Sequence, residues 1–533
     1  MARIAVIGAG MGAMAAAARL AVAGHQVAVY ERGRTHGGGV GRFERDGFAF
    51  DTGPGLVHLP AVYRDLFVKT GKEALEQCVE LAQVDPASRH LFADGTDVLL
   101  PNASRAGVVR ALDDAFGAGA GERWSDLVNR AREAWDATRR PLLEEPLRAD
   151  WRALGRDPYP APARRGISGW LRRDGGRPAT LADVARRELK DPRAAALLES
   201  HALAHSLDPR TAPAGATVLP YLEQTFGTWY ARGGMRALAD ALYERCRARK
   251  VRFSFGAEVV GILEKDGRAA GVELADGSVA DGSVAEADAV VAGIAPALLP
   301  ALLGGAEPWR DGDVRPAGDP ATGVGAAVGA AVGAAGRLTV FLALRGARPR
   351  DAAHRTVVHT PDREAELAAV FGAAGDGRGT REPCPRPTVT VLRPDDPTTR
   401  PDEDHEAVTL TATVAPHGPV DWIDGPAAGQ DADRLVAAAE AAIPGLRDRL
   451  LWREVRTPAD TAADTAAPGG AVPGPALAGA DGRFLRPANL TRLPGLYLAG
   501  GWAHPGGGLA HAGMSGAMVA GLIVDGADWR GSQ

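Results

Sequence analysis

The fold of this chain is decided by residues 3–13, which read Arg-Ile-Ala-Val-Ile-Gly-Ala-Gly-Met-Gly-Ala. The apolar first half is typical of a parallel strand that is buried on both faces. The second half has the pattern G-x-G-x-x-A. In such a turn the first glycine permits the tight bend, the second lets the backbone approach a pyrophosphate, and the small last residue lets the helix pack closely. We therefore expect Gly8, Gly10, Gly12 and Ala13 to bind a dinucleotide.

The next residues complete a strand-turn-helix-strand unit. An alanine-rich helix is expected over residues 15–23, and a second strand over Gln26–Tyr30 ends at Glu31. Glu31 lies 23 residues after Gly8, close to the spacing of about 20 expected of an acid that bonds a ribose hydroxyl. The phosphates would lie at the helix N-terminus, and the acid would repel a 2′-phosphate. The unit predicts an α/β fold with a Rossmann-type domain that does not favour NADP.

Composition excludes several classes of protein. A length of 533 residues predicts two or three lobes. The net charge of −5 leaves no basic footprint, so nucleic acid is not an expected partner. The three cysteines are widely spaced and form no ligand motif, which argues against a metal site and favours the reducing cytoplasm. No secretory signal and no membrane-spanning run are recognisable.

A glycine- and arginine-rich loop follows Glu31. This loop is either a flexible connection or a segment whose backbone N–H groups and guanidinium groups bind the same pyrophosphate as the first turn. A short strand then runs into a tight Gly-Pro bend. From these two segments we expect cofactor contacts by Arg32, Gly38, Gly39, Arg42, Gly53 and Pro54.

The C-terminal part contains a second junction of this kind. A strand at residues 496–499 ends in Gly500 and Gly501, and a Pro-Gly-rich loop through Gly508 and Leu509 leads to an apolar helix. The positive end of that helix would face the electron-rich N1 and C2 carbonyl region of a flavin. Two such junctions at opposite ends of the sequence predict that the ends meet in one domain.

Four blocks together carry a family resemblance. They are residues 8–31, 46–54, 229–235 and 495–516, and they resemble the FAD-dependent phytoene desaturase family of bacterial carotenoid desaturases. Gly39 stands where that family usually has a basic residue, so Arg42 or Arg34 is the nearest substitute. The resemblance implies FAD as the cofactor, Val259 near the adenine, a mixed-sheet substrate domain and a helical cap. It also implies a lipid-soluble polyene substrate.

These expectations divide the chain into three parts. A discontinuous FAD-binding domain is expected over residues 1–100, 225–300 and 480–533, a helical cap over 101–224, and a substrate-domain sheet over 301–479. The cap has two interpretations, which its tryptophans Trp124, Trp135, Trp151 and Trp170 do not separate. It either rests peripherally on the inner face of the cell membrane or is a solvated cap with tryptophans in its core. The resemblance favours membrane contact.

The predicted chemistry needs few acid-base residues. Hydride loss from a C–H bond beside a polyene to flavin N5 leaves a positive charge that the polyene spreads, and a neighbouring proton then leaves. His504 and His511 lie beside the expected flavin loop and are the candidates to accept that proton. No order of residues typical of a hydrolase or metalloprotease is present.

Several functions stay open at this stage. An FAD-dependent carotenoid or polyene desaturase is the principal prediction. The alternatives are a flavin amine oxidase, a flavin-dependent polyene isomerase, a desaturase of a polyene acyl chain from secondary metabolism, and a non-catalytic polyene-binding flavoprotein. The sequence does not identify the terminal electron acceptor, whether oxygen or a quinone.

Overall fold

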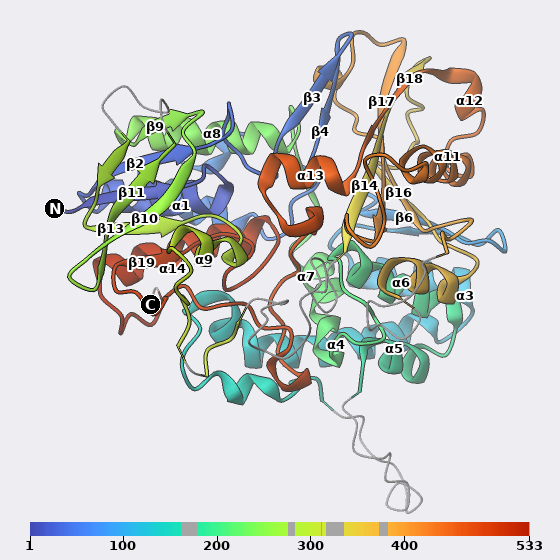
Figure 1. Cartoon of the computed structure of the whole chain (residues 1–533). Coiled ribbons are helices and arrows are strands. Elements are labelled where there is room, and N and C mark those ends of the chain that lie inside the picture. Colours follow the sequence, from blue (N-terminus) through green and yellow to red (C-terminus); the bar gives the residue numbers. More distant parts are fainter. Residues whose placement is uncertain (161–178, 276–282, 311, 316–334, 373–381, 532–533) are drawn as a thin grey trace, which may run out of the picture.

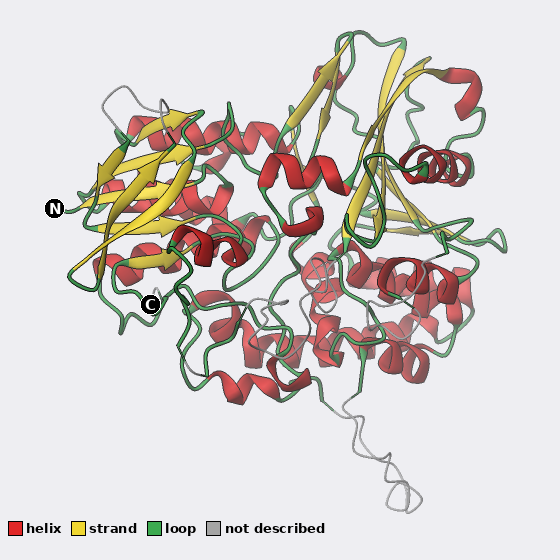
Figure 2. Ribbon diagram, in the orientation of Figure 1, coloured by secondary structure: helices red, strands yellow, loops and turns green. Residues whose placement is uncertain are grey.

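The computed structural model describes residues 1–160, 179–275, 283–310, 312–315, 335–372 and 382–531. Two main sheets, three smaller ones and a layer of helices make up the described part of the molecule (Figure 1). Figure 2 shows the smaller sheet system on one side, the larger sheet on the other, and the cap helices below. Both chain ends lie in the part that holds the first sheet, as expected from the two glycine-rich junctions.

The first sheet is parallel throughout its five strands. Its strand order is β19-β13-β1-β2-β9, so the central strand is the N-terminal one. The strands are β1 (Arg3–Ile7), β2 (Gln26–Glu31), β9 (Arg252–Phe255), β13 (Ala289–Ala292) and β19 (Leu496–Leu498). This topology confirms the α/β class and the Rossmann-type unit. A three-stranded antiparallel sheet lies beside it and comprises β10 (Val259–Lys265), β11 (Arg268–Leu274) and β12 (Val284–Glu286).

Close packing of α1 (Met11–Val22) on α14 (Leu509–Val524) joins the two ends of the chain. The face of α1 from Ala15 to Ala18 is fully buried. A Cβ atom at Gly12 would lie 2.6 Å from the Cα of Gly500. A Cβ atom at Gly516 would lie 2.5 Å from the carbonyl oxygen of Gly12. Small residues on both helices are therefore required for this packing. Helices α2 (Ala61–Gly71), α8 (Met235–Ala248) and α9 (Leu299–Leu302) complete this domain.

The second sheet is mixed, with the order β18-β14-β17-β16-β15-β6-β7. All neighbours are antiparallel except β15 and β6. Its strands are β6 (Ser88–Leu91), β7 (Asp97–Leu100), β14 (Gly336–Arg345), β15 (Arg355–Val358), β16 (Val389–Leu392), β17 (His405–Val414) and β18 (Leu450–Arg456). Helices α10 (Arg363–Phe371), α11 (Ala427–Ala439), α12 (Leu446–Arg449) and α13 (Pro458–Thr465) accompany it, and the hairpins are β3 (Arg42–Arg45) with β4 (Phe48–Asp51) and β5 (Leu81–Gln83) with β8 (Trp229–Ala231).

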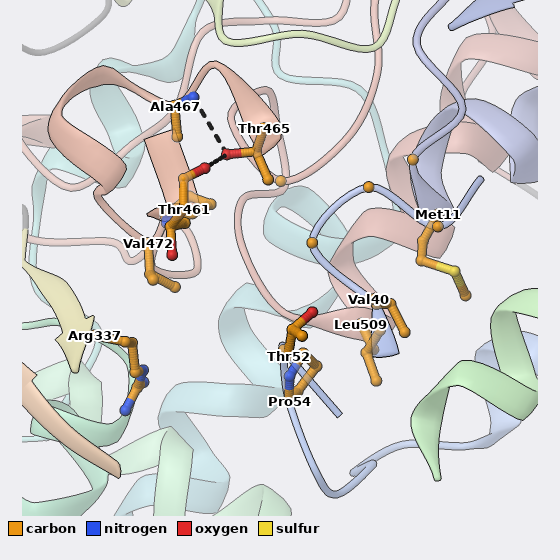
Figure 3. A pocket seen from close by; sticks show the side chains of 18 of the residues that line it. Met11, Val40, Thr52, Pro54, Arg337, Thr461, Thr465, Ala467, Val472 and Leu509 are labelled. Carbon is orange, nitrogen blue, oxygen red and sulfur yellow. Dashed lines mark hydrogen bonds between the residues drawn. The ribbon is translucent and has the colours of Figure 1, made fainter. Parts of the chain in front are cut away.

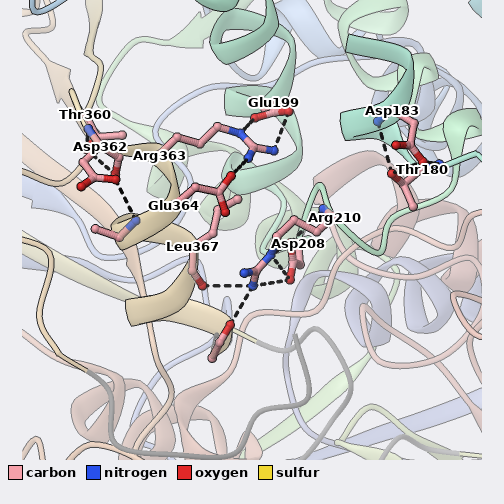
Figure 4. A network of polar contacts seen from close by, with 12 residues as sticks. Thr180, Asp183, Glu199, Asp208, Arg210, Thr360, Asp362, Arg363, Glu364 and Leu367 are labelled. Atoms are coloured by element: carbon pink, nitrogen blue, oxygen red, sulfur yellow. Dashed lines mark hydrogen bonds and ion pairs between the residues drawn. The ribbon is translucent and has the colours of Figure 1, made fainter. Parts of the chain in front are cut away.

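Ion pairs and backbone contacts attach the cap to the second sheet (Figure 4). Arg363 of α10 binds both carboxylate oxygens of Glu199 in the cap. Arg210 pairs with Asp208 and donates to the carbonyl oxygen of Leu367 at 3.2 Å. The cap helices are α3 (Arg105–Phe116), α4 (Ala120–Arg139), α5 (Leu181–Val184), α6 (Pro192–Ala204) and α7 (Val218–Phe226).

The boundaries between the parts differ from the expected ones in two places. Strands β6 and β7 fall within the stretch 1–100 but extend the second sheet, because β6 pairs with β15. Phe484 falls within 480–533 but packs in the apolar core of the cap. One continuous stretch of sequence can therefore contribute residues to two parts of the fold. The local sequence pattern does not reveal this, because it depends on contacts between distant segments.

The cap tryptophans are mostly internal. Trp124 and Trp135 are 3% and 7% exposed and belong to the core of the cap, and Trp124 donates to Gln224 at 3.1 Å. Trp151 is partly exposed and bonds the carbonyl oxygen of Gly312. Trp170 lies outside the described residues. The buried pair supports the interpretation of a cap with tryptophans in its core.

Replacing Gly516 by alanine is expected to destabilise the protein by about 1–3 kcal/mol, because the new methyl group must push α14 away from α1. Its neighbours would be the carbonyl oxygen of Gly12 and the Cβ of Ala15, at 2.5 and 2.7 Å. The free energy of unfolding from denaturant titration measures the effect. Gly429→Ala is the matched control, because Gly429 is an exposed residue of α11 with no atom within 4 Å of its Cβ position. That control is expected to stabilise the helix, and equal stability of Gly516→Ala and the natural protein would contradict the packing argument.

Candidate functional site

One cavity of about 1560 Å³ extends from the first sheet to the cap and the second sheet. Figure 3 shows it between the segments of Met11, Val40 and Leu509 on one side and Arg337 and Val472 on the other. Every residue expected from the sequence to bind the cofactor lines this cavity: Gly8, Gly10, Gly12, Ala13, Glu31, Arg32, Gly38, Gly39, Arg42, Gly53, Pro54, Val259, Gly500, Gly501, Gly508 and Leu509. Segments that are far apart in the chain thus form one continuous wall.

Glycines bring the backbone directly to the surface of the cavity. Gly38 has a φ angle of +58°, and a Cβ there would lie 3.0 Å from the Cα of Gly10. A Cβ at Gly53 would overlap the carbonyl oxygen of Gly39. At Gly10 and Gly39 themselves the space beside the Cα is open to 4 Å. The loops are therefore packed against one another, while the side facing the cavity is left free for a group that contacts the main chain.

Glu31 lies at the end of β2 and is bound by two backbone N–H groups. Ala9 donates to one carboxylate oxygen and Gly33 to the other, each at 2.7 Å. A carboxylate oxygen has lone pairs for more than one donor, so Glu31 retains acceptors for the hydroxyl groups of a ribose. The same bonds fix the glycine turn against the following loop.

Two helix N-termini face the cavity from opposite ends of the sequence. Met11 and Gly12 begin α1, and Leu509 and Ala510 begin α14; all four line the cavity. The first-turn N–H groups of a helix have no partners within the helix and carry its positive dipole end. The cavity therefore offers two regions that favour electron-rich groups, which match the pyrophosphate and the N1–C2 edge of a flavin.

The two histidines proposed as proton acceptors occupy different environments. His511 lines the cavity in the first turn of α14, and burial lowers its pKa to about 4. His504 is fully buried, lies outside the cavity lining, and binds the carbonyl oxygen of Glu145 through Nε2 at 2.9 Å. Because that carbonyl can only accept, Nε2 carries the proton. His504 therefore lacks access to a substrate in the cavity, although both residues follow the same glycine-rich strand end.

A half-buried cluster of ionisable side chains, which was not predicted from the sequence, lines the part of the cavity formed by the cap and the second sheet. Glu223 of α7 forms an ion pair with Arg355 of β15, and the Nε2 atoms of His58 and His201 lie 4.0 and 3.7 Å from its carboxylate. Burial acts to raise the pKa of Glu223, but the charges of Arg355, His58 and His201 hold it well below its usual range. The one signal of this cluster in the sequence is Glu223 itself, an ionisable residue beside the apolar residues of α7. Its partners could not be predicted, because they come from segments far away in the chain.

Two more ionisable residues in the cavity wall were also missed. Glu366 of α10 accepts from the hydroxyl of Thr388 at 2.9 Å, and burial raises the pKa of this carboxyl to about 7. Arg337 near the start of β14 also lines the cavity, and burial lowers the pKa of its guanidinium to about 10. The wall formed by the cap and the second sheet, which we call the substrate side, therefore includes ionisable side chains among its apolar ones. The wall formed by the glycine-rich loops, which we call the cofactor side, is largely main chain.

Together the parallel sheet, the two glycine-to-helix junctions, the open space at Gly10 and the carboxylate of Glu31 fit a bound FAD and define a flavoprotein fold. The model of the flavin containing amine oxidoreductase family matches residues 14–310, and the chain belongs to that family. It is an FAD-dependent oxidoreductase.

Relatives and solved structures match over nearly the whole length. The chain is 30% identical over 530 residues to hydroxyneurosporene desaturase of Rhodobacter capsulatus, covering 98% of this chain and 97% of the relative. It is 27% identical over 532 residues to 4,4′-diapolycopene oxygenase of a Methylomonas species, covering 98% of each. An oxidoreductase of Methanosarcina mazei has the same fold, with a TM-score of 0.59 at 17% identity over 97% of this chain and 99% of the other.

The Glu31→Ala variant is expected to bind FAD about tenfold or more weakly, because hydrogen bonds to a charged group contribute roughly 1.5–3 kcal/mol. The variant loses the acceptor for a ribose and leaves the N–H groups of Ala9 and Gly33 without theirs. Titration of the apoprotein with FAD, followed by flavin fluorescence, measures the affinity. Glu264→Ala, at an exposed position of β10 outside the cavity, is the control. Equal affinities of the two variants would contradict the assigned role of Glu31.

Proposed function

We propose that this protein is an FAD-dependent desaturase of a carotenoid or another long polyene. The observation that carries the proposal is the whole-length similarity to hydroxyneurosporene desaturase, which includes the cap and the second sheet as well as the FAD-binding domain. The cavity supports it, because it continues from the FAD-binding loops to a wall of apolar side chains that includes Leu219, Leu222 and Phe341. A long unsaturated chain can lie along such a wall.

The residues of the chain bind, orient and desolvate the substrate. Bound FAD supplies a hydride acceptor. The apolar wall formed by the cap and the second sheet keeps water from the reacting carbon, so that the positive charge on the polyene is not quenched by hydration. A neighbouring proton then has to leave. We propose His511 as its acceptor, because its neutral imidazole lines the cavity in the first turn of α14. A weak base suffices, since a polyene cation loses a proton readily.

The alternatives are distinguished by charge and by product mass. A protonated amine would meet the guanidinium of Arg337, whereas the carboxylate of Glu223 is already paired with Arg355, which disfavours an amine oxidase. An isomerase would leave the mass of the polyene unchanged. One relative is named an oxygenase, and an enzyme of that kind would give a product that contains added oxygen. A non-catalytic polyene-binding protein would give no product.

We also propose peripheral contact with a membrane, because the substrate is lipid-soluble. The exposed apolar side chains Leu99 and Phe226, which are 52% and 39% exposed, support this proposal. They lie on neighbouring segments, since Asn102 bonds both the N–H and the carbonyl oxygen of Thr228. Within the described part of the chain, no helix combines the length and the apolar character needed to cross a membrane. Oxygen and a quinone are both retained as candidates for the terminal electron acceptor.

Anaerobic mixing of the FAD-loaded protein with phytoene or a hydroxylated carotene in liposomes is expected to bleach the flavin absorbance. The product is expected to be lighter by two hydrogens, which mass spectrometry detects. Flotation of the protein with the same liposomes tests the membrane contact. The Glu31→Ala variant is a control that should form product in proportion to the FAD it retains. A product of unchanged mass, or no bleaching with any polyene, would contradict the desaturase assignment.

His511→Gln is expected to slow product formation by roughly 100-fold or more, as for the loss of a positioned base, with unchanged FAD content. His504→Gln is the matched control, because His504 lies outside the cavity lining, and it is expected to retain the rate of product formation while lowering thermal stability. Single-turnover flavin bleaching and product mass are measured for both. Undiminished product formation by His511→Gln would show that another group accepts the proton.

A further inference from the structure

The guanidinium of Arg337 lines the substrate side of the cavity without a carboxylate partner among the described residues. Its hydrogen-bond acceptor is the carbonyl oxygen of Ala204, at the end of α6. Two other arginines of the same sheet line the cavity, and each forms an ion pair: Arg355 with Glu223, and Arg456 with Asp464. Arg337 therefore carries a positive charge that the surrounding side chains do not balance.

Among the described residues, burial is the one resolved influence on the pKa of Arg337, and no carboxylate acts on it. His205 lies near Arg337 and near three further histidines, His58, His201 and His511, and each of these groups acts to lower its pKa. Burial lowers the pKa of His205 to about 3 and that of His511 to about 4, so both imidazoles are neutral near pH 7. Arg337 stays protonated at that pH, because its pKa is lowered only to about 10. Within the part of the chain that the structure describes, Arg337 thus has a carbonyl oxygen but no carboxylate as a partner, and the imidazoles of His205 and His511 are neutral.

The position of Arg337 separates it from the cofactor contacts. Figure 3 shows its side chain on the β14 side of the pocket, across from Thr52, Pro54 and Leu509 of the cofactor side. The phosphate-binding turn at Gly10 packs against the loop at Gly38, on that same opposite side. Arg337 is therefore available to the substrate and not to the pyrophosphate of FAD.

We propose that the substrate is a polyene carboxylic acid whose carboxylate binds Arg337. This inference rests on the proposed polyene function and names its substrate class. A planar guanidinium binds a carboxylate with two parallel hydrogen bonds, and one carboxylate neutralises the one free charge. A hydrocarbon or an alcohol can enter the same cavity but leaves the cation without a partner, so we expect it to bind more weakly than the acid. A phosphate ester would bring a charge of about −1.5 to −2 and leave a negative excess.

The experiment compares a polyene acid with its neutral ester. All-trans parinaric acid, a fluorescent linear polyene acid, and its methyl ester are titrated against the FAD-loaded protein, and the emission of the bound polyene gives both affinities without turnover. The natural protein is expected to bind the acid at least about tenfold more tightly than the ester. Arg337→Gln is expected to abolish that preference, and Arg337→Lys to retain part of it. Arg345→Gln, at the exposed far end of β14 outside the cavity, is the matched control and should keep the preference.

The outcomes separate this inference from the proposed function. Equal binding of acid and ester by the natural protein, or an undiminished preference in Arg337→Gln, would overturn the assignment of Arg337 while leaving polyene binding intact. Binding of neither compound would contradict the polyene function and this inference together. The comparison of acid and ester in the natural protein does not depend on the folding of any variant. FAD content and thermal unfolding show whether each variant is folded.

Discussion

The contact between the two helices that begin at glycine-rich turns is the constraint on which the structure depends. Gly12 and Gly516 allow α1 and α14 to approach until backbone atoms touch, and the buried alanines of α1 extend this packing. The approach places the N-terminal turn and the C-terminal glycines on the same wall of one cavity. A larger residue at either glycine would separate two helix N-termini that line one cavity. The need for close backbone approach thus explains the glycines better than chain flexibility does.

Main-chain atoms line one part of the cavity, and side chains line the other. The cofactor side consists mainly of main-chain atoms from glycine loops, with Glu31 as its principal charged acceptor. The substrate side consists of side chains from the cap and the second sheet, and it includes the half-buried pair of Glu223 and Arg355. Main-chain contacts suit a cofactor whose shape is fixed, whereas side chains can vary without disturbing the fold. The identity of the substrate therefore depends on residues that the FAD-binding motifs do not include.

This division also explains how much could be predicted from the sequence. The glycines, Glu31 and the strands of the first sheet follow local patterns, since each turn needs particular residues at fixed spacing. The strand order of the second sheet does not, because β6 joins β15 across more than 260 residues of sequence. For the same reason the pairing of Glu223 with Arg355 was missed. The sequence did not distinguish His504 from His511 as the proton acceptor. In the structure His511 lines the cavity and His504 binds the carbonyl oxygen of Glu145, and no local sequence pattern predicts this difference.

The charge of Arg337 follows from how the cap and the second sheet meet. Arg337 lies near the start of β14, next to the end of α6, and the carbonyl oxygen of Ala204 accepts its hydrogen bond. Three acidic residues at this junction already bind arginines. Glu199 binds Arg363 and Asp208 binds Arg210 (Figure 4), and Glu223 binds Arg355. An interface that only held two parts together would have no need to leave one guanidinium facing a cavity, because burying an unpaired charge is costly. A ligand that supplies the missing negative charge removes that cost. The free energy gained in this way is the expected difference in binding free energy between a polyene acid and its neutral analogues.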